Sequence, residues 1–327
     1  MVADRSIDAQ SPAAAPSGRL RRIGASRKAE APSPVERQGA RMAVLFVLPG
    51  LAIYAIFMLY PFVNSIWYSL TDWNGATTSQ QFVGIDNYVE MFQDSLLWQG
   101  LRNNFIWVVI GTISPVVIGL LLALILWSNV RGSLAFRALY FLPFILPTVV
   151  VSIVWIWIYH PLYGILPKVF DALGLQALAT GWLGDPSFAL IAVLIAAIWA
   201  TYGFVVMVLY AGLQAVNIEL VEAAMLDGAN WWQRARYIVI PQIAPVLTMV
   251  TAVTLIGGFS VFDFILVMTG GGPGTATEVL GTVTYKEAFG LNRVGYGASI
   301  SMLITLLSLV SAVIFVRVRE RGLRDVA

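Results

Sequence analysis

The sequence lacks most of the residues on which metal and redox chemistry depend. Its 327 residues include no cysteine and a single histidine, His160. The first absence excludes disulfides and thiolate metal sites, and the second excludes a metal centre built from several histidines. His160 directly follows an apolar run, where we expect an interfacial side chain. We therefore predict no catalytic residue and no metal ligand.

Charged residues are also scarce. They make up 12% of the chain, about half of the roughly 25% that is usual in soluble domains, whereas 58% of the residues are hydrophobic. A soluble core cannot bury so much apolar surface, so part of the solvent must be lipid. No lysine follows a glycine, which excludes the phosphate-binding loop GxxxxGK[ST] and with it a recognisable ATPase. The glycine-rich run 270–277, GGGPGTAT, is therefore predicted to be a flexible external loop.

Six apolar runs follow a polar N-terminal region, and each is near the roughly 20 residues that a helix needs to cross a bilayer. They cover residues 43–69, 104–127, 138–159, 188–213, 245–268 and 297–316. Their length and continuity favour helices over the alternating strands of a barrel. We predict an all-α membrane protein with six transmembrane helices.

Lysine and arginine are distributed unevenly between the ends of these runs. The N-terminal region holds eight, the loops after the second and fourth runs hold two each, and the C-terminal end holds four. The remaining loops hold only Arg102, Lys168, Lys286 and Arg293. The positive-inside rule then predicts that both termini are cytoplasmic. The expected organisation is a flexible cytoplasmic tail at 1–41, a transmembrane domain at 42–317 and a short cytoplasmic tail at 318–327.

A polar, helix-prone segment separates the fourth and fifth runs, and residues 222–241 of it read EAAMLDGANWWQRARYIVIP. Asn217 is a predicted helix N-cap, Gly228 a turn, and Pro241 the end of a second short helix. One small, smooth face of the first helix carries Val221, Ala224, Met225 and Gly228. The pattern alone indicates either a connector lying on the lipid headgroups or a helix that docks a partner.

The spacing within this segment resembles the EAA loop of ATP-binding-cassette (ABC) importer permeases. The matching positions are Glu222, Ala223, Ala224, Asp227, Gly228, Ala229, Ile238 and Pro241, whereas Ala235 and Ile240 depart from the pattern. Three other stretches, at 82–88, 262–273 and 296–301, resemble the maltose-type and glycerol-phosphate-type sugar branch of these permeases. The resemblance covers about residues 42–317, with the permease core at about 100–316.

This resemblance implies a type I, MetI-like permease core in the bacterial inner membrane, with a cytoplasmic coupling helix between transmembrane helices 4 and 5. The coupling residues would be Glu222, Ala223, Ala224, Asp227, Gly228 and Ala229. The implied partners are a second homologous permease subunit, two ATPase subunits, an extracytoplasmic solute-binding protein and membrane lipid, with no nucleic acid. The chain would bind no cofactor, because ATP and Mg would lie on the ATPase subunits.

Candidate substrate contacts lie in the fourth and fifth runs. Asp263 is the only acid inside a run, where a carboxylate is costly, so it either contacts sugar hydroxyls or bonds the glycine-rich exit of its run. Trp199 and Tyr202 offer aromatic faces for a sugar, with helix packing as the alternative. The resemblance adds Ala200, Thr201, Thr254 and Gly258. Trp157 and Tyr159 are expected to be interfacial anchors.

Two functions therefore stand at the level of sequence. The first is a permease subunit that forms half of the pathway of an ABC importer for a sugar or oligosaccharide. The second is an ion-coupled secondary transporter of small polar solutes, for which Asp263 would be the only charged residue available for coupling within the runs.

Overall fold

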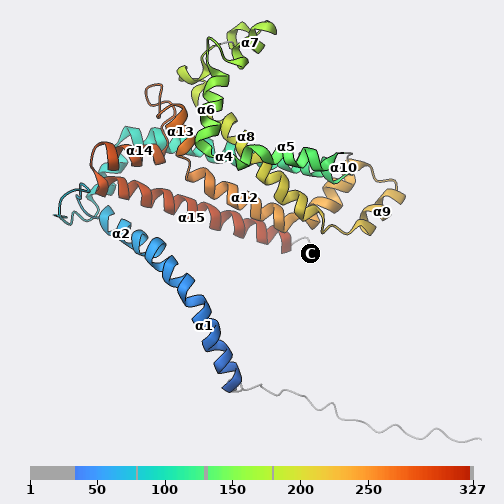
Figure 1. The fold of residues 1–327 in the computed structure, drawn as a ribbon, viewed down its shortest axis with the longest axis horizontal. Coiled ribbons are helices and arrows are strands. Elements are labelled where there is room, and N and C mark those ends of the chain that lie inside the picture. The colour runs from blue at the N-terminus through green and yellow to red at the C-terminus, as the bar shows by residue number, and fades with distance from the viewer. Residues whose placement is uncertain (1–33, 79, 129–131, 179, 325–327) are drawn as a thin grey trace, which may run out of the picture. The chain divides into compact units, whose positions relative to one another are not determined.

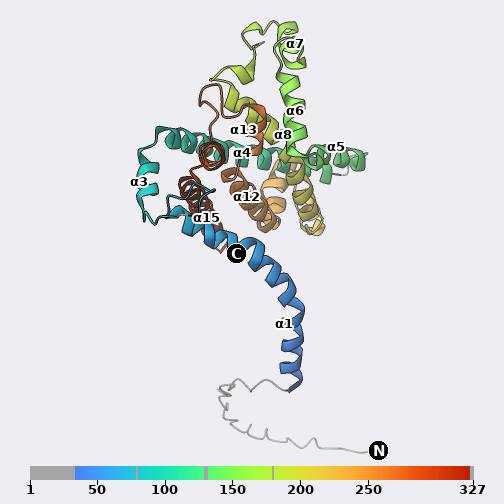
Figure 2. The same cartoon turned by 60° about the vertical axis from the view of Figure 1, so that its left-hand side comes forward.

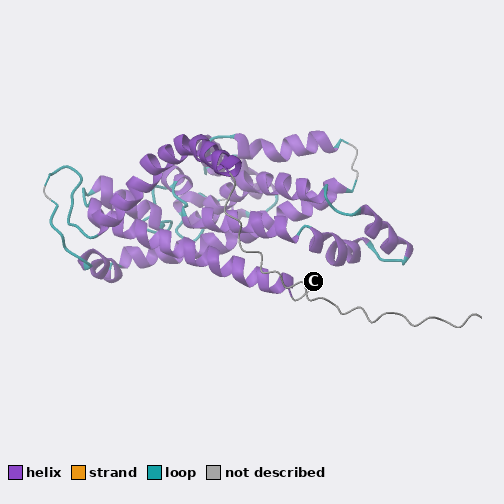
Figure 3. Ribbon diagram, turned by 90° about the horizontal axis from the view of Figure 1, so that it is seen from below, coloured by secondary structure: helices purple, strands orange, loops and turns teal. Residues whose placement is uncertain are grey.

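The computed structural model describes residues 34–78, 80–128, 132–178 and 180–324. Within these ranges the chain consists of helices and loops, and an isolated bridge between Thr71 and Phe82 is the only β-type pairing (Figure 3). The all-α prediction is confirmed. The chain divides into two compact units, residues 1–59 and residues 60–327.

Within its described residues, 34–59, the first unit consists of α1 (Pro34–Tyr54), which continues into the π-helical turn η1 (Ala55–Leu59). It begins inside the region predicted as a tail, eight residues before the expected boundary. Its described apolar side chains are exposed, including Phe46 at 81% and Phe57 at 71%. Because they lack a partner within the unit, they are suited to lipid or to another chain.

The second unit is a bundle of long helices joined by short ones (Figure 1). Its α-helices are α2 (Tyr60–Ser69), α3 (Asp86–Gln93), α4 (Ser95–Trp127), α5 (Ser133–Ile145), α6 (Thr148–Tyr159), α7 (Ile165–Ala172), α8 (Ala189–Leu213), α9 (Ile218–Leu226), α10 (Trp231–Arg234), α11 (Ile240–Gln242), α12 (Ala244–Phe259), α13 (Asp263–Met268), α14 (Leu280–Tyr285) and α15 (Val294–Arg324). In the bundle, α4 packs along α8 and α12, and α12 packs against α15. A Cβ on Gly203 would lie 1.9 Å from the Tyr140 carbonyl oxygen, so α5 and α8 touch backbone to backbone.

By length and apolar composition, four described helical segments could cross a membrane, and six could if each of two bent pairs is one span. One pair is α5 and α6, which meet at 98°. The bend falls at Leu146 and Pro147, where the proline ring disfavours a helical conformation in the residue before it. As a result α6 and α7 project from the bundle (Figures 1 and 2). The second pair, Trp231–Gln242 with α12, is bent by 76°.

The fifth and sixth runs differ from their predicted boundaries. The fifth run does not form one helix from 245 to 268, because α12 ends at Phe259 and α13 begins at Asp263. The intervening residues 260–262 belong to neither helix, although the Phe262 carbonyl accepts the Leu266 amide in the first turn of α13. The final helix α15 continues to Arg324, past the predicted end at 316. Pro241 does not end the segment before the fifth run, since a π-helical turn, η4 (Ala235–Val239), precedes it and α11 continues through it.

Candidate functional site

A cavity of about 370 Å³ lies where α12 breaks before α13. Its wall is built from α4, α5, α6, α8, α12, α13 and the break itself. The lining residues are Trp107, Gly111, Phe144, Thr148, Ala197, Ile198, Thr201, Phe204, Val253, Thr254, Gly257, Gly258, Ser260, Val261, Phe262, Asp263 and Phe264. An apolar, aromatic wall with a few polar groups is typical of a small-molecule site.

Four of the predicted substrate contacts meet in this cavity: Thr201, Thr254, Gly258 and Asp263. The Thr201 hydroxyl donates to the Ala197 carbonyl at 2.8 Å, and the Thr254 hydroxyl lies within 3.1 Å of two carbonyls of its own helix. Each hydroxyl uses its proton in a bond to a backbone carbonyl of its own helix. The lone pairs on its oxygen therefore remain free to accept a hydrogen bond from a solute. A Cβ on Gly258 would lie 3.3 Å from the Cα of Val108, so this glycine also lets α12 approach α4.

Asp263 is the only charged residue among the lining residues. It occupies the first turn of α13 and is exposed, and among the described residues no hydrogen bond to its carboxylate is found. The glycine-rich loop begins at the opposite end of α13, so the alternative that Asp263 bonds this exit is not supported. The carboxylate is therefore available to accept hydrogen bonds from a solute in the cavity.

The other aromatic candidates do not line the cavity. Trp199 packs edge-on against Trp155 at 5.9 Å between ring centroids, and Tyr202 packs edge-on against Tyr140 at 6.3 Å. Both therefore take the helix-packing alternative, and Ala200 is not part of the lining either. The aromatic surface comes instead from α4, α5, α8 and α13. Its members, which the sequence reasoning missed, are Trp107, Phe144, Phe204, Phe262 and Phe264.

The two predicted interfacial anchors at the end of α6 differ from each other. Trp157 is 64% exposed, as an anchor would be. Tyr159 is only 2% exposed, and its hydroxyl donates to the Ala192 carbonyl at 3.0 Å. The prediction for Tyr159 is wrong, because the bend before α6 turns this residue into the core between α6 and α8.

The segment between α8 and α12 has the local structure that its sequence indicated. The Asn217 side chain accepts the Glu219 amide at 2.9 Å and caps α9, and Gly228 adopts a left-handed φ of +82° in the following turn. Asn230 and Gln233 form a capping box at the start of α10. The Arg234 guanidinium donates to the Ala229 carbonyl at 2.7 Å, which closes the turn.

The predicted small face of α9 is only partly open to solvent. Val221 is 8% exposed and packs in a core cluster with Leu124 and Val239. Ala224 is half-buried, whereas Met225, which is 55% exposed, and Gly228 are open. A second face of the helix is exposed throughout and carries Glu219, Glu222, Ala223 and Leu226. Of the six predicted coupling residues, Glu222, Ala223, Asp227 and Gly228 are exposed, whereas Ala224 and Ala229 are half-buried.

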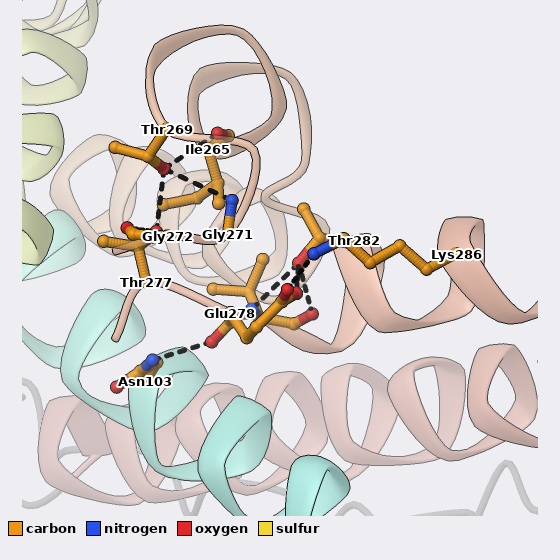
Figure 4. A network of polar contacts seen from close by, with 10 residues as sticks. Asn103, Ile265, Thr269, Gly271, Gly272, Thr277, Glu278, Thr282 and Lys286 are labelled. Carbon is orange, nitrogen blue, oxygen red and sulfur yellow. Dashed lines mark hydrogen bonds and ion pairs between the residues drawn. The ribbon is translucent and has the colours of Figure 1, made fainter. Parts of the chain in front are cut away.

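The glycine-rich loop is held by hydrogen bonds, unlike the flexible loop that was expected (Figure 4). The Thr277 hydroxyl pairs with the Thr269 hydroxyl at 2.7 Å and donates to the Gly272 carbonyl at 2.7 Å. Next to the loop the Glu278 side chain is buried, and it accepts from the Thr282 hydroxyl at 2.6 Å and pairs with the Lys286 ammonium. The loop and α14 therefore form one bonded unit.

Comparisons with known proteins identify the family. The model of the family described as binding-protein-dependent transport system inner membrane component matches residues 115–325. A probable ABC transporter permease protein of Pyrococcus horikoshii is 39% identical over 82% of this chain and 91% of its own length. The trehalose/maltose transport system permease protein of Thermococcus litoralis is 32% identical over 88% of this chain and 96% of its own.

The fold is shared with solved structures. A bacterial ABC transporter involved in the import of the acidic polysaccharide alginate has a chain that superposes with a TM-score of 0.77, at 21% identity, over 88% of this chain and 99% of its own. Its helical architecture agrees with the bundle described above. The chain thus belongs to the family of binding-protein-dependent transport system inner membrane components, and it is a membrane-embedded permease subunit of an ABC transporter rather than an enzyme.

Proposed function

We propose that this chain forms half of the transmembrane pathway of an importer for an uncharged sugar or oligosaccharide. The observation that carries the proposal is the cavity at the α12 break, with its aromatic wall, two threonines and one carboxylate. Aromatic faces suit the C–H surface of a sugar ring, while the threonine and Asp263 oxygens accept from its hydroxyls. The lining contains no lysine or arginine, which disfavours a phosphorylated or acidic solute.

Two relatives support a sugar as the solute. One is the trehalose/maltose permease named above, and another is a multiple sugar-binding transport system permease protein of Streptococcus mutans, 30% identical over 84% of this chain. The alginate importer, whose solute is acidic, shares the fold but only 21% of the sequence. The choice between a monosaccharide and an oligosaccharide belongs to the binding protein and to the other half of the pathway.

The proposed topology has six spans, with the two bent pairs counted as one span each and both termini in the cytoplasm. The tails at 1–41 and 318–327 and the domain at 42–317 remain predictions. The positive-inside distribution of lysine and arginine supports this orientation. It places α9 and its exposed face on the cytoplasmic side and the glycine-rich loop outside.

The proposed energy source is a pair of separate ATPase subunits that dock on α9 and the Gly228 turn. The exposed carboxylates and Leu226, which is 90% exposed, supply a polar rim and an apolar anchor for such a partner. A second permease subunit and an external binding protein complete the assembly, and a solved relative of the fold is a complex with a periplasmic protein that binds an alginate pentasaccharide. ATP and Mg would be bound by the ATPases and no cofactor by this chain.

The test is a pull-down of the tagged chain from gently solubilised membranes, comparing wild type with Gly228→Asp. Wild type should bring down an ATPase and a second permease, and the variant should lose the ATPase alone. If wild type recovers no ATPase in several mild detergents, or if Gly228→Asp retains it, the proposed docking of ATPase subunits on α9 and the Gly228 turn fails.

A further inference from the structure

Two adjacent asparagines on α4 carry no role in the function proposed so far. Asn103 is 3% exposed and Asn104 is fully buried. In a helix at membrane depth a buried carboxamide is costly unless each of its polar atoms is bonded. Both side chains bond backbone groups more than 150 residues away in the sequence, and the Asn103 Oδ1 also accepts from Gln99 Nε2 on its own helix at 3.5 Å.

Asn104 bonds the chain on both sides of the α12 break. Its Nδ2 donates to the carbonyl of Phe259, the last residue of α12, at 3.2 Å. Its Oδ1 accepts the amide of Leu280, the first residue of α14, at 2.7 Å. A helix has no internal partner for either of these terminal groups. One carboxamide therefore satisfies both, using its donor and its acceptor at once.

Asn103 holds the end of the glycine-rich loop. Its Nδ2 donates to the Glu278 carbonyl at 2.7 Å (Figure 4) and to the Ala276 carbonyl at 2.9 Å. A Cβ on Gly100, one helical turn earlier, would lie 3.3 Å from the Leu280 nitrogen, so α4 approaches α14 at backbone distance. The loop, the start of α14 and the end of α12 thus share one support on α4.

Part of the cavity wall lies next to the backbone groups that the two asparagines bond. Residues 260–264 line the cavity and directly follow the Phe259 carbonyl that Asn104 bonds. A Cβ on Gly281 would lie 2.7 Å from the Val261 carbonyl, so α14 also rests against the break. The loop and the cavity wall are therefore joined by a continuous series of contacts through α14 and Asn104, along which a displacement of the loop can be transmitted.

We propose that Asn103 and Asn104 are positioning residues that join the glycine-rich loop and the outer wall of the cavity into one body on α4. In the proposed assembly the resemblance to sugar permeases implies that the external loop contacts the binding protein, and that contact would be transmitted to the cavity wall through this body. This inference rests on the proposed function, since it requires an external protein that delivers the solute. Neither asparagine touches the cavity itself.

The test uses the complete transporter in liposomes, with the partner permease, the ATPases and the binding protein. Basal ATPase activity, ATPase activity stimulated by loaded binding protein, and uptake are measured together. In Asn104→Leu, complex yield and basal activity should stay within about twofold of wild type. The binding-protein concentration that gives half-maximal stimulation should rise about tenfold, the size of a typical coupling between two sites.

Asn104→Asp adds a readout that simple packing would not give. A protonated carboxyl can donate to Phe259 and accept from Leu280, whereas a carboxylate can only accept. Stimulation relative to wild type should therefore be near normal at low pH and fall as pH rises, and the leucine variant should show no such dependence. Wild type and the leucine variant carry the same neighbouring charged groups, Arg102, Glu278 and Lys286, so normalising to them at each pH removes any effect of pH that does not arise from Asn104→Asp.

Thr112→Val is the matched control. Thr112 lies two turns further along α4, is 4% exposed, and its hydroxyl has no hydrogen-bond partner among the described residues. The substitution removes a buried polar atom without breaking a bond, so all three activities should match wild type. If Thr112→Val lost as much stimulation by the binding protein as Asn104→Leu, the effect would reflect any buried change on α4, and the proposal would fail.

The remaining outcomes are also decisive. Normal stimulation in Asn104→Leu, or failure of both Asn104 variants to assemble at every pH, would limit the asparagines to folding and overturn the inference. If wild-type transporter shows neither stimulation nor uptake, the proposed function fails instead. The two failures are distinguishable because only the second involves the unaltered chain.

Discussion

Residues 217–242 and residues 259–287 both interrupt the long helices of the bundle. They differ in where their carboxylates lie: the first segment exposes them to solvent, and the second buries the carboxylate of Glu278. In the first segment Leu226 is 90% exposed, and the carboxylates of α9 face solvent. In the second, Glu278 is 1% exposed, and its carboxylate is bonded by Thr282 and Lys286. The first segment leaves an apolar side chain and carboxylates open to solvent, whereas the second bonds the carboxylate of Glu278 inside the protein.

The largest effect is expected from a charge on the exposed face of α9. Leu226→Glu or Glu222→Lys should reduce uptake to background, because a docking anchor is lost or its charge reversed. Stability should change by less than about 0.5 kcal/mol, since both side chains are exposed. Uptake by cells and size-exclusion chromatography after heating measure the two quantities.

A second exposed leucine is the control for this prediction. Leu134 on α5 is 74% exposed and lies outside the proposed docking surface. Leu134→Glu should leave ATPase recovery intact in the pull-down. Equal loss in Leu134→Glu and Leu226→Glu would show that exposure alone, and not the position on α9, explains the effect.

In the outer segment a single methyl group should reduce stability. Gly281→Ala places a Cβ 2.7 Å from the Val261 carbonyl, and the resulting overpacking should cost about 1–3 kcal/mol. Gly290→Ala is the matched control, because no atom lies within 4 Å of its Cβ. Thermal unfolding of the solubilised complex compares the two, and equal midpoints would contradict the tight contact between α14 and the α12 break.

Removing the partner of Glu278 should have a smaller effect. Lys286→Met leaves a buried carboxylate with one fewer donor, which should cost about 1–2 kcal/mol, discounted because the lysine side chain is 42% exposed. The double variant with Glu278→Gln should recover most of this loss, since the uncompensated charge is gone. If the double variant is no more stable than the single one, the two side chains act independently.

The smallest effect concerns Glu287, which lies between α14 and α15. Burial raises the pKa of this carboxyl above its ordinary value of 4.5, while Arg293 partly opposes the shift. The folded state then holds the proton more tightly than the unfolded state, so this group favours folding below pH 4.5 and loses that contribution as pH rises through the raised pKa. Glu287→Gln should flatten this dependence, as measured by thermal unfolding between pH 4 and 7.

The sequence predicted the features that depend on neighbouring residues and missed those that depend on distant contacts. The Asn217 cap and the Gly228 turn depend on neighbours within three residues, so their local signals were sufficient. The burial of Val221 within the predicted small face of α9 had no such local signal, because Val221 packs in a cluster with Leu124, almost a hundred positions earlier. The role of Asn104 had no local signal at all, since its partners lie 155 and 176 residues away.

The cavity shows a similar limit. Thr201, Thr254 and Gly258 were reached through a resemblance, and Asp263 through the cost of a charge in an apolar run. Trp107 and Phe204 were missed because an aromatic residue in a hydrophobic run looks the same whether it faces lipid, another helix or a cavity. Only the packing of α4 against α8 and α12 decides among these environments.

The break after Phe259 also bears on how the chain is made. With 16 residues, α12 is about 24 Å long, short of a hydrocarbon core of about 30 Å. During synthesis the insertion machinery responds to linear hydrophobicity, and residues 245–268 form an apolar stretch in which Asp263 is the only charged residue. We therefore expect the stretch to enter the bilayer as a continuous helix and to break at residues 260–262 when it packs against α4 and Asn104 bonds Phe259. Insertion and the formation of the transport pathway would then be separate events in the biogenesis of the subunit.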